Sequence, residues 1–191
     1  MYWKDEGYLL SKTNFDENSI IINAFTLNHG KYSGVVYGGA SRKQKKNFQV
    51  GNKILLNWRS KGENKLGYFN IELIKPIAPQ FFDDKKRSIC VLSASTILKI
   101  LLPEGQINKK IYESFESLIN QFISKDWIKL YIYWELSLIK DLGFGYDLKK
   151  DNEDNIKKAL IFNRKLLMEN FIIPNRLKFP FFRNVLENYF S

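Results

Sequence analysis

The fold is decided between residues 20 and 37, a stretch that reads Ile20-Ile21-Ile22-Asn23-Ala24-Phe25-Thr26-Leu27-Asn28-His29-Gly30-Lys31-Tyr32-Ser33-Gly34-Val35-Val36-Tyr37. Two runs rich in β-branched and aromatic residues, 20–26 and 32–37, flank the turn residues Asn28-His29-Gly30. Two such runs around an Asn/Gly turn predict a β-hairpin.

Three further runs on either side of this hairpin have the composition of strands. They are the short apolar run 8–10, the run 54–59 after the turn residues Val50-Gly51-Asn52, and the alternating run 68–74. Five short strands in the first 78 residues suit a small closed barrel, in which no long strand edge is left unpaired.

The pattern changes after Pro76 and Pro79, where the apolar period rises from about two to about 3.6 residues. We expect a helix from Asp83-Asp84 to about Leu102, and others that begin at Asn108 and Asp126, the latter ending before Gly143. Two more are expected over residues 156–170 and 182–189. The sequence therefore predicts an α+β chain of two domains, a five-stranded barrel over 1–78 and an all-α helical domain over 79–191.

Composition sets limits on function. The chain has 191 residues, of which 45% are hydrophobic and 26% charged, as in a folded protein. Because Cys90 and His29 are the sole cysteine and histidine, an intrachain disulfide and the common His/Cys zinc sites are excluded. We therefore expect no metal and no cofactor. The sequence starts with no signal-peptide pattern and has no apolar run long enough to span a bilayer, so a cytoplasmic, nucleoid-associated protein is expected.

The net charge of +10 is concentrated in one segment: residues 31–65 hold nine basic residues and one acidic residue. A basic run at 42–46 follows one predicted strand, two more cations belong to the next strand, and aromatic residues are interleaved with them. Cations along a backbone track together with aromatic faces are what single-stranded nucleic acid binding requires. The alternative is a solvated loop, with many of the aromatic residues packed in the barrel core. The candidate nucleic-acid-binding residues are Lys31, Tyr37, Arg42, Lys43, Lys45, Lys46, Lys53 and Arg59.

No catalytic constellation emerges. Neither a phosphate-binding glycine loop nor a dinucleotide fingerprint is present. His29 has no neighbouring serine or cysteine to activate, so a role in the turn is favoured over a role as a base. Cys90 is interpreted as a small buried hydrophobe, and the acid pairs before predicted helices as caps. Glu135, beside an aromatic stripe, is interpreted as a half-buried, paired carboxylate. An enzyme is not expected.

Several motifs together resemble the bacterial recombination mediator family RecO. The resemblance covers nearly the whole chain and is carried by Trp3-x-Asp5-Glu6-Gly7-Tyr8-Leu9-Leu10, Phe25-Thr26-Leu27-Asn28-His29-Gly30-Lys31 with Gly34 and Val35, Gly38-Gly39-Ala40-Ser41-Arg42, Gln49-Val50-Gly51-Asn52, Leu142-Gly143-Phe144-Gly145-Tyr146-Asp147-Leu148 and Arg164-Lys165-Leu166-Leu167. Two features depart from the family. Many members carry a cysteine-bearing excursion where this chain has only residues 149–155, and many have a basic residue at the position of Tyr37.

The resemblance implies an OB-fold followed by a helical domain. It also implies a non-enzymatic role in DNA repair and recombination: binding single- and double-stranded DNA, annealing complementary strands, and helping the recombinase RecA replace single-strand-binding protein. The implied partners are RecR and the acidic C-terminal tail of single-strand-binding protein. Such a tail needs an apolar pocket with cations at its rim, and the candidate residues for it are Lys125, Trp127, Lys129 and Lys140. The alternative function is an RNA-binding OB module with a helical oligomerisation domain.

Overall fold

The computed structural model describes residues 1–41, 44, 47–60, 62, 66–144 and 155–190. Its first part is a sheet of five strands, β1 (Tyr2–Asn14), β2 (Ile20–Thr26), β3 (Gly30–Val36), β4 (Lys53–Arg59) and β5 (Gly67–Lys75). The strands pair in the order β1-β2-β3-β5-β4, and β4 pairs back with β1 to close a barrel. All neighbours are antiparallel except β3 and β5, which are parallel. This five-stranded closed sheet is the OB-fold architecture.

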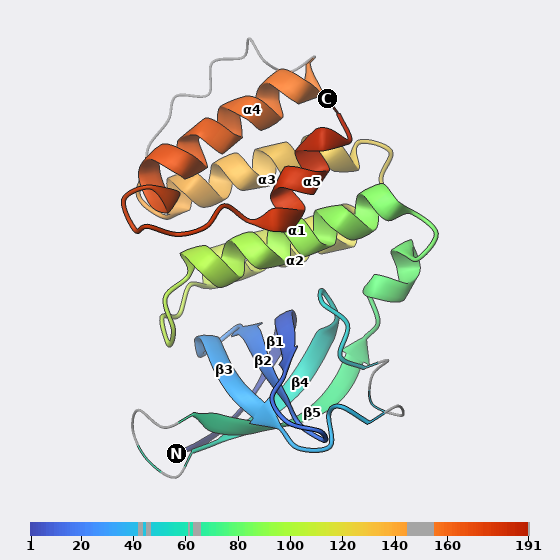
Figure 1. Ribbon diagram of the computed structural model, residues 1–191, viewed down its shortest axis with the longest axis vertical. Coiled ribbons are helices and arrows are strands. Elements are labelled where there is room, and N and C mark those ends of the chain that lie inside the picture. Colours follow the sequence, from blue (N-terminus) through green and yellow to red (C-terminus); the bar gives the residue numbers. More distant parts are fainter. Residues whose placement is uncertain (42–43, 45–46, 61, 63–65, 145–154, 191) are drawn as a thin grey trace.

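The second part is helical. A 3-10 turn, η1 (Ala78–Phe81), precedes the helices α1 (Lys85–Leu101), α2 (Lys109–Gln121), α3 (Trp127–Asp141) and α4 (Ile156–Leu167). A π-helical turn, Met168–Ile172, and α5 (Phe181–Asn188) complete the described part. Figure 1 shows α1 and α2 next to the barrel, α3 and α4 farther away, and α5 lying across α3 and reaching α1. The predicted α+β organisation, an OB-fold barrel followed by helices, is confirmed.

The helices begin where the sequence places a capping side chain. Asp84, Asn108 and Asn155 each accept a hydrogen bond from the backbone N–H three residues ahead, at 3.0, 3.1 and 3.0 Å. Each bond satisfies one of the N–H groups that a first helical turn leaves without a partner. Asp126 stands at the cap position of α3, but its side chain makes no capping bond.

β1 is much longer than the three-residue run predicted for it, and it is buried on both sides. Leu9 belongs to the barrel core with Ile22, Leu56 and others. Its neighbours Tyr8 and Leu10 belong instead to the core of the helical layer. Because successive side chains of a strand point to opposite faces, β1 is shared between the two cores.

The turn between β2 and β3 lies against the loop between α1 and α2. Gly30 has a φ of 77°, and a Cβ added there would lie 2.2 Å from the carbonyl oxygen of Gln106. The backbone N–H of Gly105 also donates to the carbonyl of Lys31 at 2.9 Å. Only glycine allows this conformation and this close approach together.

Candidate nucleic-acid interface

Four side chains form a strip across the outer face of the barrel, the exposed Tyr2, Tyr37 and Arg59 and the half-buried Tyr68, and we call them the Tyr–Arg strip. Tyr2 of β1 is the register partner of Arg59 of β4, and Arg59 is in turn the partner of Tyr68 of β5. The Arg59 guanidinium lies 5.2 Å from the centre of the Tyr2 ring. The rings of Tyr68 and Tyr37 lie 6.2 Å apart.

The register explains why these side chains share one face. In β4, Ile54, Leu56 and Trp58 point into the barrel core, so Arg59 points outward. In β5, Phe69 points inward and Tyr68 outward. Directly paired residues on neighbouring strands lie on the same side of the sheet, which places an outward residue of each strand in one row.

The strip combines the two features that bind single-stranded nucleic acid without sequence preference. The side chains of Tyr2 and Tyr37 are 60% and 71% exposed, so their ring faces are accessible to a ligand. Bases can stack on these rings, and the guanidinium of Arg59 can pair with a phosphate.

Two of the eight predicted nucleic-acid-binding residues, Tyr37 and Arg59, lie on this strip. Arg42, Lys43, Lys45 and Lys46 lie outside the described residues. Tyr2 and Tyr68 were not predicted, because only the pairing of β1 and β5 with β4 brings them to the strip. Sequence alternation around Phe69 was the available signal for Tyr68.

Lys31 and Lys53 are directed at the helical layer instead of the strip. The Lys31 ammonium donates to the carbonyl of Lys99 at the end of α1 at 2.6 Å. Burial lowers the pKa of Lys31, and nearby Glu104 offsets part of this effect. Lys53 lies 2.8 Å from Glu116 and 3.0 Å from Glu6. Burial alone would lower the pKa of Lys53, but its hydrogen bonds to these two carboxylates raise it.

The predicted partner-binding residues are not all together. Lys125 and Lys129 are exposed at the start of α3, whereas Lys140 is in its last turn. At 1.5 Å per residue, Lys140 is roughly 16 Å along the helix axis from Lys129. Trp127 is only 8% exposed, because the Arg87 guanidinium at 5.7 Å and the Phe190 ring at 6.1 Å lie against it.

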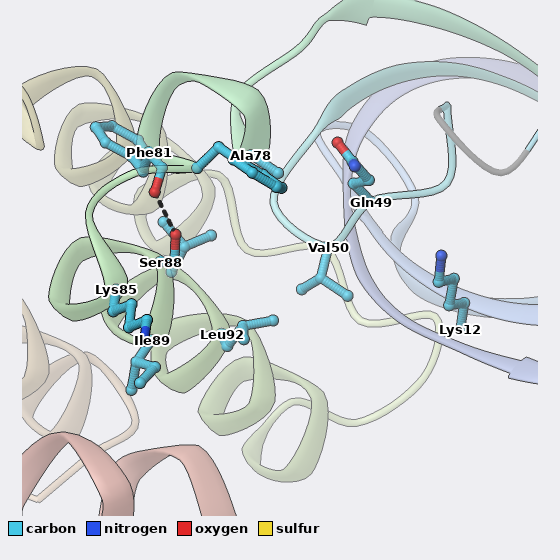
Figure 2. Close-up of a pocket in the computed structure, with 11 residues that line it drawn as sticks. Lys12, Gln49, Val50, Ala78, Phe81, Lys85, Ser88, Ile89 and Leu92 are labelled. Carbon is cyan, nitrogen blue, oxygen red and sulfur yellow. Dashed lines mark hydrogen bonds between the residues drawn. The ribbon is translucent and has the colours of Figure 1, made fainter.

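An open apolar pocket of about 480 Å³ lies elsewhere, between the barrel and the first helix (Figure 2). Val50 lines it from the barrel side, and Phe81, Ile89 and Leu92 line it from η1 and α1. The ammonium groups of Lys12 and Lys85 are the cations among the residues that line it. Sequence reasoning placed a partner pocket on α3 and did not find this one, because it is formed by segments far apart in the chain.

Two further features concern metal ions and membranes. Within the described ranges, no three His, Cys, Asp or Glu side chains gather where they could hold a metal ion. Among the helices of those same ranges, none is long and apolar enough to cross a membrane.

Comparison with known proteins agrees with the fold. The family model for the N-terminal part of recombination protein O matches residues 1–77, and the model for its C-terminal part matches residues 83–157. The DNA repair protein RecO of Hyphomonas neptunium is 36% identical over 151 residues, which are 78% of this chain and 62% of that protein. The RecO proteins of Wolbachia sp. subsp. Drosophila simulans and Ehrlichia chaffeensis are 34% and 32% identical over 164 residues each.

Those 164 residues are 85% of this chain and 68% and 66% of the two relatives. The chain thus spans about two thirds of the length of the curated relatives it matches. Both family models match in their expected order along the chain, and many relatives share the same name. The chain therefore belongs to the recombination protein O (RecO) family of DNA repair proteins.

Proposed function

We propose that this chain is a non-enzymatic recombination mediator that acts at the nucleoid and binds single-stranded DNA along the Tyr–Arg strip. The observation that carries the proposal is the outward-facing row of three tyrosine rings and one guanidinium across β1, β4, β5 and the end of β3. Stacking on rings is tolerant of sequence, as strand annealing requires, because every base has a π face.

Basic residues that follow Tyr37 and Arg59 in the sequence support further contacts with phosphates. The basic run Arg42 to Lys46 follows Tyr37 by a few residues, and Lys61 and Lys65 follow Arg59. In this proposal they bind single- and double-stranded DNA through phosphates, while the tyrosines discriminate in favour of unpaired bases. Together these contacts would hold two complementary strands and anneal them.

The salt dependence of binding tests this proposal. Arg59→Gln should weaken binding of a fluorescent thymidine oligomer and reduce the log–log salt slope by about 0.7, the value expected for one lost phosphate contact on a single strand. Neutralising Arg42, Lys43, Lys45 and Lys46 together should reduce the slope by about 0.7 for each contact made. Lys157→Gln on α4 is the matched control, because it removes the same charge from an exposed helical position.

Fluorescence anisotropy at several salt concentrations gives these slopes. If Arg59→Gln and Lys157→Gln change the slope equally, the strip does not contact the phosphates. The same titration with an RNA oligomer of equal length tests the alternative function. RNA bound more tightly than DNA would favour an RNA-binding module.

We also propose that the helical layer binds RecR and the acidic C-terminal tail of single-strand-binding protein, so that the chain helps RecA load on coated DNA. Lys125 and Lys129 are exposed cations beside the buried ring of Trp127, which supports a site at the start of α3.

Lys129→Glu should then abolish binding of a tail peptide and annealing of coated strands, with annealing of naked strands unchanged. Lys140→Glu should have little effect if the site is confined to the start of α3. Lys85→Glu as the only damaging change would place the tail in the pocket of Figure 2.

A further inference from the structure

Three nearly parallel rings form a column that runs from the barrel core to the surface. The Trp3 and Trp58 rings lie 5.5 Å apart with an angle of 15° between their planes. The His29 ring lies 4.3 Å from the Trp3 ring, at an angle of 9°. Trp58 is buried at the inner end, whereas 32% of the His29 side chain is exposed at the outer end.

The outer ring is held in place by a buried carboxylate. Nδ1 of His29 lies 2.9 Å from Oδ2 of Asp5, whose side chain is 4% exposed. Asp5 also accepts hydrogen bonds from the backbone N–H of Asn28 at 2.7 Å, from the Asn28 side chain at 3.0 Å and from the backbone N–H of Glu6 at 2.9 Å. Tyr32 packs edge-on against Trp3. The imidazole is therefore fixed before any ligand arrives, and little entropy is lost when something stacks on it.

Two contacts limit where a ligand can meet this imidazole. Trp3 covers one face and Asp5 occupies Nδ1, while 32% of the side chain is exposed, so a ligand would approach the opposite face or the Nε2 edge. The column and the Tyr–Arg strip lie on opposite faces of β1 and β4, because Trp3 and Trp58 are the chain neighbours of Tyr2 and Arg59.

We infer that the imidazole of His29 is a stacking platform for one unpaired base of single-stranded DNA, an inference that rests on the function proposed above. The base continues the Trp58–Trp3–His29 column by one more ring, and Nε2 forms a hydrogen bond with the base or with its phosphate. Asp5 is a positioning residue that keeps the ring parallel to Trp3. Because duplex bases are already stacked on one another, the platform selects single strands over duplexes.

The test compares three ligands of equal length: a thymidine oligomer, the same backbone with abasic sites in place of bases, and a duplex. The proteins are the full 191-residue chain and its variants His29→Ala, His29→Phe and Asn28→Ala. His29→Phe keeps an aromatic face but loses the bond to Asp5. Asn28→Ala removes a side-chain bond to Asp5 next to His29 and so controls for loosening of the turn.

We expect His29→Ala to weaken binding of the thymidine oligomer by about 5- to 150-fold, the range found when one stacking residue is replaced by alanine. Binding of the abasic backbone and of the duplex should change by about twofold or less, because both retain their phosphate contacts. His29→Phe should restore most of the affinity, and Asn28→Ala should leave it near the unmodified value.

Three results would overturn the inference. His29→Ala could bind the thymidine oligomer as well as the unmodified chain does. The loss could be equal on the abasic backbone, which would indicate a phosphate contact or a disturbed fold. His29→Phe could bind the thymidine oligomer as weakly as His29→Ala, with Asn28→Ala equally impaired. That result would show that His29 only stabilises the turn. If the unmodified chain binds none of the three ligands, the proposed function fails and the inference fails with it.

Discussion

Glu135 is a fully buried carboxylate whose charge is balanced by the fully buried guanidinium of Arg183. Arg183 Nε donates to Glu135 Oε1 at 2.7 Å, and the hydroxyl of Tyr131 donates to the same oxygen at 2.9 Å. Asn163 donates to Oε2 at 3.0 Å. The sequence predicted a paired but half-buried carboxylate at this position, and the pairing arises from a helix nearly fifty residues away. The pair therefore fastens α5 to α3.

Removing one member of this pair should destabilise the fold strongly. Arg183→Met should lower the free energy of unfolding by about 3–5 kcal/mol, because it leaves a buried carboxylate without its counter-charge. The double variant Glu135→Leu/Arg183→Met should recover much of the loss, since it removes both charges together. Urea unfolding of the two variants measures the difference. A double variant less stable than Arg183→Met would show that the pair itself is not the source of the effect.

The Asp5 carboxylate should make the free energy of unfolding depend on pH in the acidic range. Burial raises its pKa, but hydrogen bonds from His29, Asn28 and Glu6 outweigh this and hold the pKa below its usual range. A carboxylate whose pKa is lower in the folded state stabilises that state above the unfolded pKa, and the contribution disappears as pH falls through the folded pKa. Asp5→Asn should therefore be less stable than the unmodified chain above about pH 5.

The gap in unfolding free energy between these two proteins should shrink steadily below about pH 4, because the unfolded carboxylate takes up a proton there while the native carboxylate stays charged until its lower pKa is reached. Unfolding in urea at several pH values between about 3 and 6 gives the gap directly. A gap that stays constant over this range would mean that Asp5 contributes through shape and not through charge.

At the scale of single elements, α2 is fastened to the barrel by one cluster of polar side chains. The hydroxyl of Tyr8 donates to Glu116 at 2.9 Å, and the ammonium of Lys53 lies 2.8 Å from the same oxygen. Burial would raise the pKa of Glu116, but these two hydrogen bonds lower it, because they stabilise the carboxylate in its charged form. Burial and the bond to Glu116 raise the pKa of Tyr8, so its hydroxyl stays a donor.

Glu116→Gln should cost about 1–2 kcal/mol of unfolding free energy, because it replaces two charge-assisted hydrogen bonds by weaker neutral ones. Glu113→Gln on the same helix is the matched control, since Glu113 is exposed and should change stability by less than about 0.5 kcal/mol. Thermal or urea unfolding of both variants compares them. Equal effects would show that α2 gains nothing specific from this cluster.

The elements themselves were largely predictable, but their extents and partners were not. The helix starts at Asp84, Asn108 and Asn155 follow from local capping chemistry, which a sequence displays directly. β1 was predicted over three residues and spans Tyr2–Asn14, because its charged residues interrupt the apolar pattern. Asp5 is buried there only because Asn28 and His29, from another strand connection, supply its hydrogen bonds.

The same limit applies to the candidate interface. Tyr37 and Arg59 could be identified from basic and aromatic composition, since each is outward on its own segment. The composition could not show that Arg59 lies on the strip and Lys53 does not, although both belong to β4. Lys53 meets carboxylates of β1 and α2 at the helical end of the strand, and those contacts depend on how the helices sit on the barrel.

At the scale of the whole molecule, one of the two hydrophobic cores is built jointly by the barrel and the helices, and the other lies inside the barrel. Tyr8 and Phe25 of the barrel belong to the same cluster as Tyr112 and Phe115 of α2. The Tyr8 and Phe115 rings lie 5.2 Å apart, and the Phe25 and Tyr112 rings 5.5 Å apart. A barrel separated from its helices would expose these rings to water. The division of the chain at residue 78 was predicted from a change in hydrophobic period, which carries no information about such shared packing.

We therefore expect the barrel and the helices to unfold as one cooperative unit. Phe115→Ala should cost about 3–5 kcal/mol, the usual effect of removing a large aromatic side chain from a core. Because Phe115 packs on β1, amide hydrogen exchange should accelerate by similar factors in β1 and β2 and in α1 and α2. Phe69 lies in the separate barrel core, and Phe69→Ala should also accelerate amide exchange in the helices as well as in the strands.

Exchange measured by mass spectrometry distinguishes this behaviour from that of two independent domains. Independent domains would keep full protection in the strands when Phe115 is truncated, and they would keep full protection in the helices when Phe69 is truncated.

Cooperative unfolding has a consequence for the proposed mediator. A partner bound to the helical layer would stabilise the barrel that carries the Tyr–Arg strip, because ligands that bind only the folded state stabilise everything that unfolds with their site. A tail peptide should then raise the protection of β1 and β2 amides as well as those of α3, and protection confined to α3 would contradict the shared core.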